Sequence, residues 1–275
     1  MTERYSSHYA EQWPVPSATL DDLDKVRLVQ YFRSRFPGWK QPERWHTTLT
    51  DHKLAVEWNG RIVPTQIGVL LFSEKPSRFI PDAHIVATDH MPATPNNGST
   101  KNRCFTGPLP EQVAMAAAWL RDPHPDQPLS ERRDGGGPQQ LYSQGALYEA
   151  VLNALAHRDY EIRQSSVRIH RHPDRILFEN PGSLCGSLTP ENLYVGCQPY
   201  RRNEMLTGYL HHYARHDTGF RTWADWQDGF LTLVRKSTEL SGRRPLLEQI
   251  RQGTALTIYA RAREADSDFQ IGEAT

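Results

Sequence analysis

Apolar residues recur every three or four positions in several stretches of the chain, which is the spacing of an amphipathic helix. These stretches are residues 20–36, 110–121, 143–160 and 204–213. Asp21 and Asp22 fall in the first turn of the first stretch, where the helix dipole favours negative charge. Pro110 stands near the start of the second stretch and Ser143 can cap the third. The pattern therefore predicts helices at these places.

Short apolar or alternating runs between turn residues predict strands. Residues 83–88, 165–170 and 175–179 fit this pattern, and a turn at 172–174 joins the last two in a hairpin. Asn59-Gly60 is a typical hairpin turn. Residues 65–72 are predicted to be buried on both faces, as a helix or a strand. Residues 246–252 are interpreted as a helix or loop, and residues 254–260 as a strand that closes the sheet.

Polar stretches rich in proline or glycine divide the chain. We expect a flexible leading segment over residues 1–19, a helical and α+β segment over 20–134, an ATPase-like α+β domain over 135–262 and a disordered tail over 263–275. Residues 89–106 and 122–140 are predicted to be loops. The run Gly135-Gly136-Gly137 lacks the Lys-Ser/Thr of a P-loop.

Composition narrows the class of protein. The 275 residues contain 32 Lys plus Arg and 32 Asp plus Glu, which argues against coating nucleic acid or membrane through bulk charge. No apolar run approaches the length of a membrane span, and the N-terminus lacks a signal pattern. Cys104, Cys185 and Cys197 have no CxxC spacing, so neither a disulfide framework nor a zinc site is indicated. We expect a soluble, cytoplasmic protein.

Candidate chemistry gathers on the helix predicted at 143–160. Glu149, Asn153 and His157 recur every fourth residue and line one flank of its apolar stripe. Arg158 and Asp159 follow at its C-terminal end. Such a ridge suits a phosphate or metal site. The alternative is that these groups only satisfy loop backbone at the edge of the core, with Arg158 and Asp159 as an ordinary ion pair.

Further motifs follow in a fixed order. The chain reads ExxxNAxxHRDY over 149–160, DRILFENPGSL over 174–184, LTPENL over 188–193 and RRN over 201–203, after GVLLFSEKPSRFIPDAHI at 68–85. Together they resemble the ATP-binding regulators described as RecG-like or Schlafen/AlbA-type transcriptional regulators. The C-terminal half of that family is similar to the ATPase superfamily of gyrase, histidine kinases and MutL. The resemblance covers roughly residues 18 to 220.

The resemblance implies an α+β, two-layer fold in which helices cover a mixed, mostly antiparallel sheet, as in a divergent Bergerat-like ATPase. It implies that Asn153 holds Mg²⁺ against the phosphates of ATP, and that Glu149 activates water in members that hydrolyse ATP. Such roles suit an amide and a carboxylate one helical turn apart. His157, Arg158 and Asp159 would border the phosphates.

The strand end at Glu179, Asn180 and Gly182 corresponds to the Asp-x-Gly-x-Gly of the superfamily, where an acid receives the adenine amino group. Asn180 occupies the acid position here, and its amide can still accept a hydrogen bond, without charge assistance. Arg202 and Asn203 of RRN are expected to contact the nucleotide, or to be a solvated helix start.

The phosphate loop departs from the family pattern. In place of Gly-Thr-Gly-Ile, the chain offers only the run from His216 to Phe220, with Gly219 as its glycine. Asp217 in that run would repel a triphosphate unless a metal lay between them.

The expected function is a Mg-ATP-binding regulatory subunit of a nucleic-acid-associated system, either transcription control or defence against foreign DNA, with slow hydrolysis or none. Neither an AlbA-type domain nor a winged helix is visible, so nucleic acid would be contacted through a separate domain or chain. A protein partner or a homo-oligomer is expected, and no membrane. The alternative is a degenerate, non-enzymatic scaffold for protein–protein assembly.

Two weaker hypotheses remain. Arg201, Arg202, Arg243 and Arg244 could bind DNA or RNA directly. Five histidines at 170, 172, 211, 212 and 216 invite a metal interpretation, but paired histidines without a third ligand are more often surface polar groups.

Overall fold

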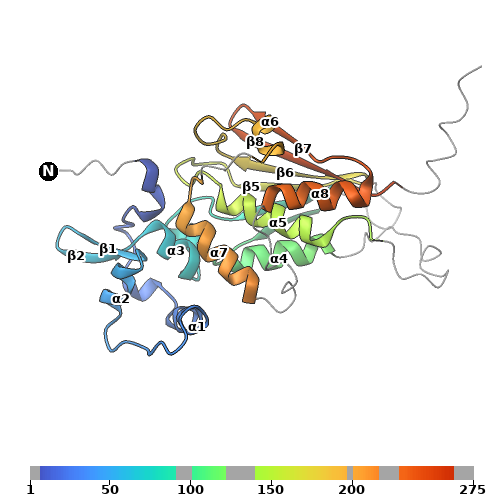
Figure 1. Ribbon diagram of the computed structural model, residues 1–275. Coiled ribbons are helices and arrows are strands. Elements are labelled where there is room, and N and C mark those ends of the chain that lie inside the picture. The colour runs from blue at the N-terminus through green and yellow to red at the C-terminus, as the bar shows by residue number, and fades with distance from the viewer. Residues whose placement is uncertain (1–6, 91–100, 122–139, 197–200, 217–228, 263–275) are drawn as a thin grey trace, which may run out of the picture.

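The computed structural model describes residues 7–90, 101–121, 140–196, 201–216 and 229–262, and the architecture below concerns these residues. Helices pack on one face of a six-stranded sheet, and a smaller N-terminal part with a two-stranded sheet lies at one end (Figure 1). The strands are β1 (Ala55–Trp58), β2 (Arg61–Pro64), β3 (Ile85–Asp89), β4 (Lys101–Phe105), β5 (Val167–Arg171), β6 (Arg175–Pro181), β7 (Leu246–Ile250) and β8 (Gly253–Tyr259).

The α-helices are α1 (Lys25–Arg35), α2 (Trp45–Asp51), α3 (Gln66–Phe72), α4 (Leu109–Arg121), α5 (Gln144–Ala156), α6 (Pro190–Tyr194), α7 (Glu204–His216) and α8 (Gly229–Ser241). Short 3-10 turns are η1 (Ser7–Gln12), η2 (Leu20–Asp22) and η3 (Pro76–Arg78).

The large sheet has the strand order β4-β3-β5-β6-β8-β7. Its neighbours pair antiparallel except β3 and β5, which run parallel. A parallel pair needs a crossover, and α4 and α5 supply it. The predicted α+β fold, with helices on a mixed and mostly antiparallel sheet, is confirmed. Strands β3 and β4 come from the N-terminal side of the boundary expected at residue 135.

Helix α5 lies at the centre of the helical layer, between α4, α7 and α8, and it contacts β6 (Figure 1). Nearly all of its residues are buried. Ser143 caps it, as predicted, because the Ser143 hydroxyl accepts a hydrogen bond from Ala146 N at 3.5 Å. With apolar side chains around most of the helix, α5 is held by burial on several sides.

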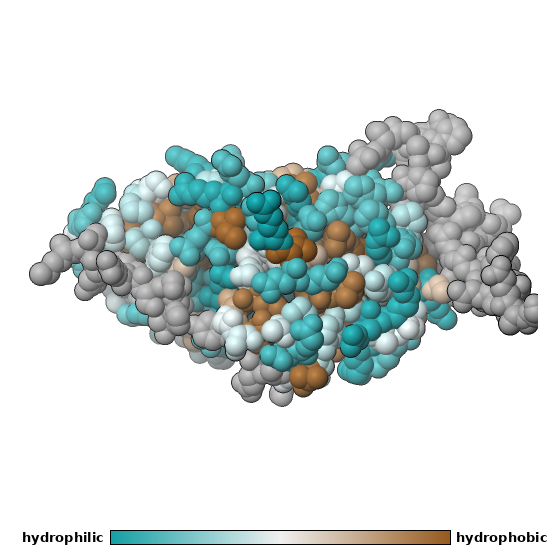
Figure 2. Space-filling model, turned by 90° about the horizontal axis from the view of Figure 1, so that it is seen from above, coloured by the Kyte–Doolittle hydropathy of each residue, from teal (hydrophilic) through white to brown (hydrophobic). Residues whose placement is uncertain are grey.

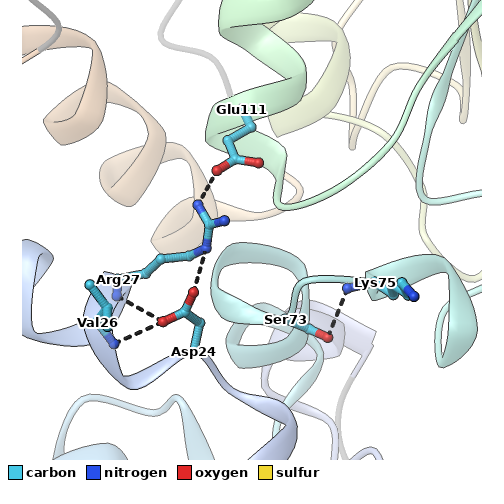
Figure 3. A network of polar contacts seen from close by, with 6 residues as sticks. All are labelled: Asp24, Val26, Arg27, Ser73, Lys75 and Glu111. Carbon is cyan, nitrogen blue, oxygen red and sulfur yellow. Dashed lines mark hydrogen bonds and ion pairs between the residues drawn. The ribbon is translucent and has the colours of Figure 1, made fainter.

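The first predicted helix begins later than its acidic run suggested. Residues 20–22 form the separate turn η2, and α1 starts at Lys25. Its cap is Asp24, whose carboxylate accepts from Val26 N and Arg27 N. Arg27 contacts Asp24 and reaches across to Glu111, so one guanidinium joins α1 to α4 (Figure 3).

Other predictions need correction at the edges of the sheets. Strand β4 lies within the stretch 89–106 that was predicted to be a loop, while residues 91–100 lie outside the described residues. Residues 246–250 form strand β7, where a helix or loop was expected. As a result β8 lies between β6 and β7 and does not close the sheet. Residues 66–72 are helix α3, which settles the open choice between helix and strand.

The outer edge of β7 is partly closed by a side chain. The Tyr194 hydroxyl accepts a hydrogen bond from Leu247 N at 2.8 Å and donates one to Pro245 O at 2.7 Å. The Arg244 guanidinium lies over the Tyr194 ring. Because an exposed edge strand invites pairing with another chain, this capping protects part of β7.

The face of the sheet away from α4, α5 and α8 is less covered. Leu246 and Ile250 of β7 are 40% and 41% exposed. In a view from above, turned by 90° from Figure 1, hydrophobic residues lie among hydrophilic ones in the middle of the molecule (Figure 2). Among the helices in the described part of the chain, none has the length and apolar character needed to cross a membrane.

Candidate functional site

The ridge predicted on α5 forms, and two of its members contact each other. Asn153 Nδ2 donates a hydrogen bond to Glu149 Oε1 at 3.0 Å. Glu149 is buried, whereas Asn153 one turn farther along is only partly so. Because the Asn153 nitrogen is turned toward the carboxylate, its amide oxygen is the atom left for another contact.

Glu149 is covered by the start of α8. A Cβ atom built on Gly229, the first residue of that helix, would overlap Oε1 of Glu149. Burial raises the pKa of Glu149 to about 7, and the hydrogen bond from Asn153 opposes this shift. Near neutral pH the carboxyl is therefore partly protonated, which is unusual for a glutamate.

His157 ends α5 and belongs to a cationic neighbourhood. Burial, followed by the charges of Arg201, His211 and Arg202, lowers the pKa of His157 to about 4. The imidazole is therefore neutral at pH 7. A neutral ring can donate or accept a hydrogen bond and adds no positive charge of its own.

Arg158 faces the protein interior. Its side chain is completely buried, its guanidinium lies 4.6 Å from the Tyr160 ring centroid, and Nη2 donates to Ser165 O at 3.1 Å. Burial lowers the pKa of Arg158. This placement separates Arg158 from the exposed flank of α5.

Asp159, Gly182 and Arg202 meet at the turn after β6. Arg202 Nη1 lies 2.6 Å from Asp159 Oδ2, and Arg202 Nη2 donates to Ser183 O at 2.9 Å. Asp159 N donates to Pro181 O at 2.9 Å. Gly182 has φ 111°, and a Cβ there would lie 2.8 Å from Asp159 Cβ. The turn thus requires glycine, both for its backbone and for the space around it.

Asn203 joins α5 to α7. Its Nδ2 donates to Ala156 O at 3.0 Å and to Arg158 O at 2.9 Å, and the residue is almost fully buried. The carbonyls at a helix end lack intrahelical partners, and Asn203 satisfies them here. The RRN motif thereby holds the end of α5 in place: Arg202 binds the turn and Asn203 binds the helix terminus.

Glu179 and Asn180 are consecutive in β6 and point to opposite faces of the sheet. Asn180 shares the helix-covered face with Phe178, which is buried. Its Oδ1 is buried and has no hydrogen-bond partner within the described part of the chain. Glu179 instead lies on the other face, 3.5 Å from His170 Nε2. The structure therefore places Asn180 on the helix-covered face of the sheet and Glu179 on the opposite face.

Two glycines that the sequence did not single out shape this region. Gly229 contacts Glu149, as described above, and a Cβ on Gly253 would overlap the carbonyl oxygen of Asn180. Gly253 pairs with Pro181 at the end of β6. Each glycine is the first residue of its element, α8 or β8, and for Gly253 the sequence signal was its place after a turn. Gly219, which was assigned to the phosphate loop, lies outside the described residues.

The histidines divide into separate groups. His170 and His172 come together with His90, which no pattern had indicated: His90 Nε2 lies 2.8 Å from His170 Nδ1, and the His90 and His172 rings stack at 4.5 Å. His212 is buried elsewhere, 2.9 Å from Ser34 Oγ. Across the ranges that the structure describes, no three or more His, Cys, Asp or Glu residues are arranged to hold a metal.

Part of the chain is similar to a known protein family. Residues 164–258 match a family model described as "Putative ATP-dependent DNA helicase recG C-terminal". This range contains β5, β6, β7, all but the last residue of β8 and the turn at Gly182, and it begins after α5. No curated protein matches the chain.

Among solved structures, the DIP2311 protein from Corynebacterium diphtheriae, a Northeast Structural Genomics Consortium target, is similar in fold, with a TM-score of 0.57 and 18% sequence identity. The similarity covers 88% of this chain and 39% of that chain, so the chain corresponds to well under half of that protein. At this identity the likeness concerns the fold. The match over residues 164–258 and the helix-on-sheet architecture together show that the chain contains an ATPase-like domain of the RecG C-terminal family.

Proposed function

We propose that the chain binds Mg-ATP between α5 and the Gly182 turn, and that binding, with slow hydrolysis or none, is its output. The observation that supports this most directly is the buried Oδ1 of Asn180 on the helix-covered side of β6, which has no hydrogen-bond partner among the described residues. A buried acceptor without a donor is unfavourable, and the exocyclic amine of adenine would supply the donor.

The surrounding residues fit the same ligand. The amide oxygen of Asn153, which the hydrogen bond to Glu149 does not use, is a hard ligand of the kind that Mg²⁺ prefers. Gly182 lets the turn pack closely against the Asp159–Arg202 pair, because it has no Cβ. When bound, Mg²⁺ would neutralise charge on the phosphate oxygens. Asn153, Asn180 and Gly182 are thus the proposed binding residues, with Arg202 and Asn203 holding the turn and the helix end around them.

Glu149 is the proposed general base, and its surroundings favour slow turnover. The carboxylate is bonded to Asn153 and covered by Gly229, and burial raises its pKa to about 7. A base must be deprotonated and within reach of the water that it activates. A carboxyl that is closed in and partly protonated meets neither condition well.

We further propose that the chain acts as a regulatory subunit of a nucleic-acid-associated system, either transcription control or defence against foreign DNA. Two observations support this. The matching family model is described as a putative ATP-dependent DNA helicase C-terminal region. The similarity to the DIP2311 protein covers only 39% of that longer chain. Nucleic acid would then be contacted through another domain or chain. A protein partner or a second copy belongs to the same proposal.

A thermal-shift and calorimetry series tests the binding. We expect Mg-ATP to raise the melting temperature of the wild type, because a ligand that binds only the folded state stabilises it. Asn153→Ala should abolish the part of this stabilisation that depends on Mg²⁺, whereas Glu149→Ala should remove only ATP hydrolysis. Asn102→Ala, an exposed asparagine of β4, is the matched control. If calorimetry shows that the wild type does not bind ATP, the proposal is refuted.

The burial of Glu149 also favours a second candidate function, a degenerate scaffold for protein–protein assembly. A carboxylate that already has a partner and lies beneath a helix needs no ligand. This candidate predicts no shift in melting temperature with Mg-ATP and a stable complex with another chain. Calorimetry on the wild type therefore separates the two candidates.

A further inference from the structure

A buried carboxylate from the N-terminal segment lies at the start of α7. Glu11 is 2% exposed, and its two oxygens accept hydrogen bonds from Met205 N at 2.9 Å and from Leu206 N at 2.8 Å. These amides belong to the first turn of α7, where backbone N–H groups lack intrahelical partners. The residues that make the contact are 194 and 195 positions apart in the chain.

The contact is held firmly on the side of the N-terminal segment. Gln66 N donates to Trp13 O at 2.9 Å, and Pro14 forms a bridge with Thr65, so the segment is tied to the start of α3. Gln12 adds a contact from its Nε2 to the Met205 sulfur at 3.3 Å. Glu11 therefore projects from a backbone that is fixed independently of α7.

The same turn of α7 follows directly on the residues that support the proposed site. Asn203 binds the carbonyls at the end of α5, and Arg202 binds Asp159 and Ser183 O beside Gly182. A displacement of the start of α7 would carry both side chains with it. The helix and its preceding residues form a direct connection from Glu11 to the Gly182 turn.

We propose that Glu11 is a positioning residue of the nucleotide site: by capping α7 it sets where Arg202 and Asn203 stand, and through them the Gly182 turn and the end of α5. This rests on the proposed nucleotide binding. It also makes residues 7–14 a working part of the ATPase-like unit, although they lie far outside the range 164–258 matched by the family model.

The test compares Glu11→Ala, Glu11→Gln and Asp24→Ala with the wild type. Asp24 is the matched control, because its carboxylate also caps a helix, α1, by accepting from two backbone amides, here both through Oδ1. The probe is a non-hydrolysable ATP analogue with Mg²⁺, titrated by calorimetry under conditions in which each variant is folded. Amide hydrogen exchange at Met205, Leu206 and Gly182 is the second measurement.

We expect Glu11→Ala to weaken binding about tenfold, the size of coupling usual between residues of one network. Exchange should become faster at Met205 and Leu206, and also at Gly182, whose amide donates to Gln252 O. Glu11→Gln retains one acceptor oxygen and should recover most of the affinity. Asp24→Ala should lose stability while keeping its affinity and the exchange rate of Gly182.

A folded Glu11→Ala variant with wild-type affinity and unchanged exchange at Gly182 would overturn the proposal, as would an equal loss of affinity in Asp24→Ala. Should Glu11→Ala fail to fold, the same two measurements on Glu11→Gln decide. If the wild type binds no analogue, the proposed function fails, and exchange at Gly182 alone decides whether Glu11 positions the turn.

Discussion

Gly229 and Glu149 stand so close that no side chain fits between them: a Cβ on the first residue of α8 would overlap a carboxylate oxygen of α5. The contact joins the helix that carries the proposed base to the helix that covers it. It also means that the position of α8 and the state of Glu149 cannot change independently.

We therefore expect Gly229→Ala to destabilise the fold by about 2 kcal/mol, the usual range for forcing a methyl group into a packed site. Combining it with Glu149→Ala should recover much of this loss, because the overlapping atoms are gone. Chemical denaturation of the two single variants and the double variant measures the coupling. Gly208→Ala is the control: no atom lies within 4 Å of a Cβ at that position in α7, and alanine should be neutral or stabilising there. Simple additivity of the two changes would contradict the contact.

Glu149 should make stability depend on pH. Its folded pKa of about 7 lies above the ordinary value of 4.5, so the folded state holds the proton more tightly than the unfolded state. The stability from this group is complete below pH 4.5 and is lost as the pH rises through 7, by on the order of 3 kcal/mol. Glu149→Gln removes the titration. The free energy of unfolding of the wild type, relative to this variant, should fall between pH 5 and 8; a constant difference would contradict the burial of an ionisable carboxyl.

Asn180 should determine the preference for adenine. Asn180→Asp replaces a neutral acceptor by a charged one, and charge-assisted hydrogen bonds are roughly twice as strong. We expect the affinity for Mg-ATP to rise several-fold relative to Mg-GTP, as measured by competitive titration. Asn102→Asp adds the same charge on exposed β4 and should leave the ratio unchanged. An equal effect on both nucleotides would place Asn180 away from the base.

The Tyr194 hydroxyl should stabilise the edge of β7. Tyr194→Phe removes both of its hydrogen bonds, to Leu247 N and Pro245 O, which we expect to lower the free energy of unfolding by about 1–2 kcal/mol. The freed amide of Leu247 would also be open to another strand, so the variant should associate more at high concentration in sedimentation experiments. Tyr259→Phe is the control, because that ring also lies beneath an arginine guanidinium. Identical sedimentation of wild type and Tyr194→Phe would show that the edge is protected by other means.

Elements with strong local periodicity could be predicted from the sequence. Helix α5, its Ser143 cap and the β5–β6 hairpin follow from patterns within a few residues. Strand β4 was missed because an edge strand is mostly exposed and reads KNRCF, without an apolar alternation. Strand β7 was missed for the same reason: most of its residues are exposed. Edge strands are recognised by their neighbours, which only the folded sheet supplies.

For the candidate site, too, contacts within one element could be predicted from the sequence, and contacts between distant elements could not. Glu149 and Asn153 are one helical turn apart, so their contact follows from helix geometry. That Asn180 lies on the helix-covered face while Glu179 lies on the opposite face depends on the register of β6, which a single sequence leaves open. The contacts of Gly229 with Glu149 and of Glu11 with α7 join residues far apart in the chain, and no local pattern encodes them. His90 joined His170 and His172 for the same reason, since β3 and β5 are neighbours only in the sheet.

The parallel pairing of β3 with β5 has a consequence for how the protein can be divided. Residues 85–89 align with residues 167–171, so the centre of the sheet cannot assemble until the polypeptide beyond residue 171 has emerged. A fragment that begins near residue 135 would retain the whole matched range 164–258, yet without β3 it would leave one side of β5 unpaired, with its amides facing water. The isolated fragment would therefore have an exposed edge strand, able to pair with another chain, where β3 is paired in the intact protein.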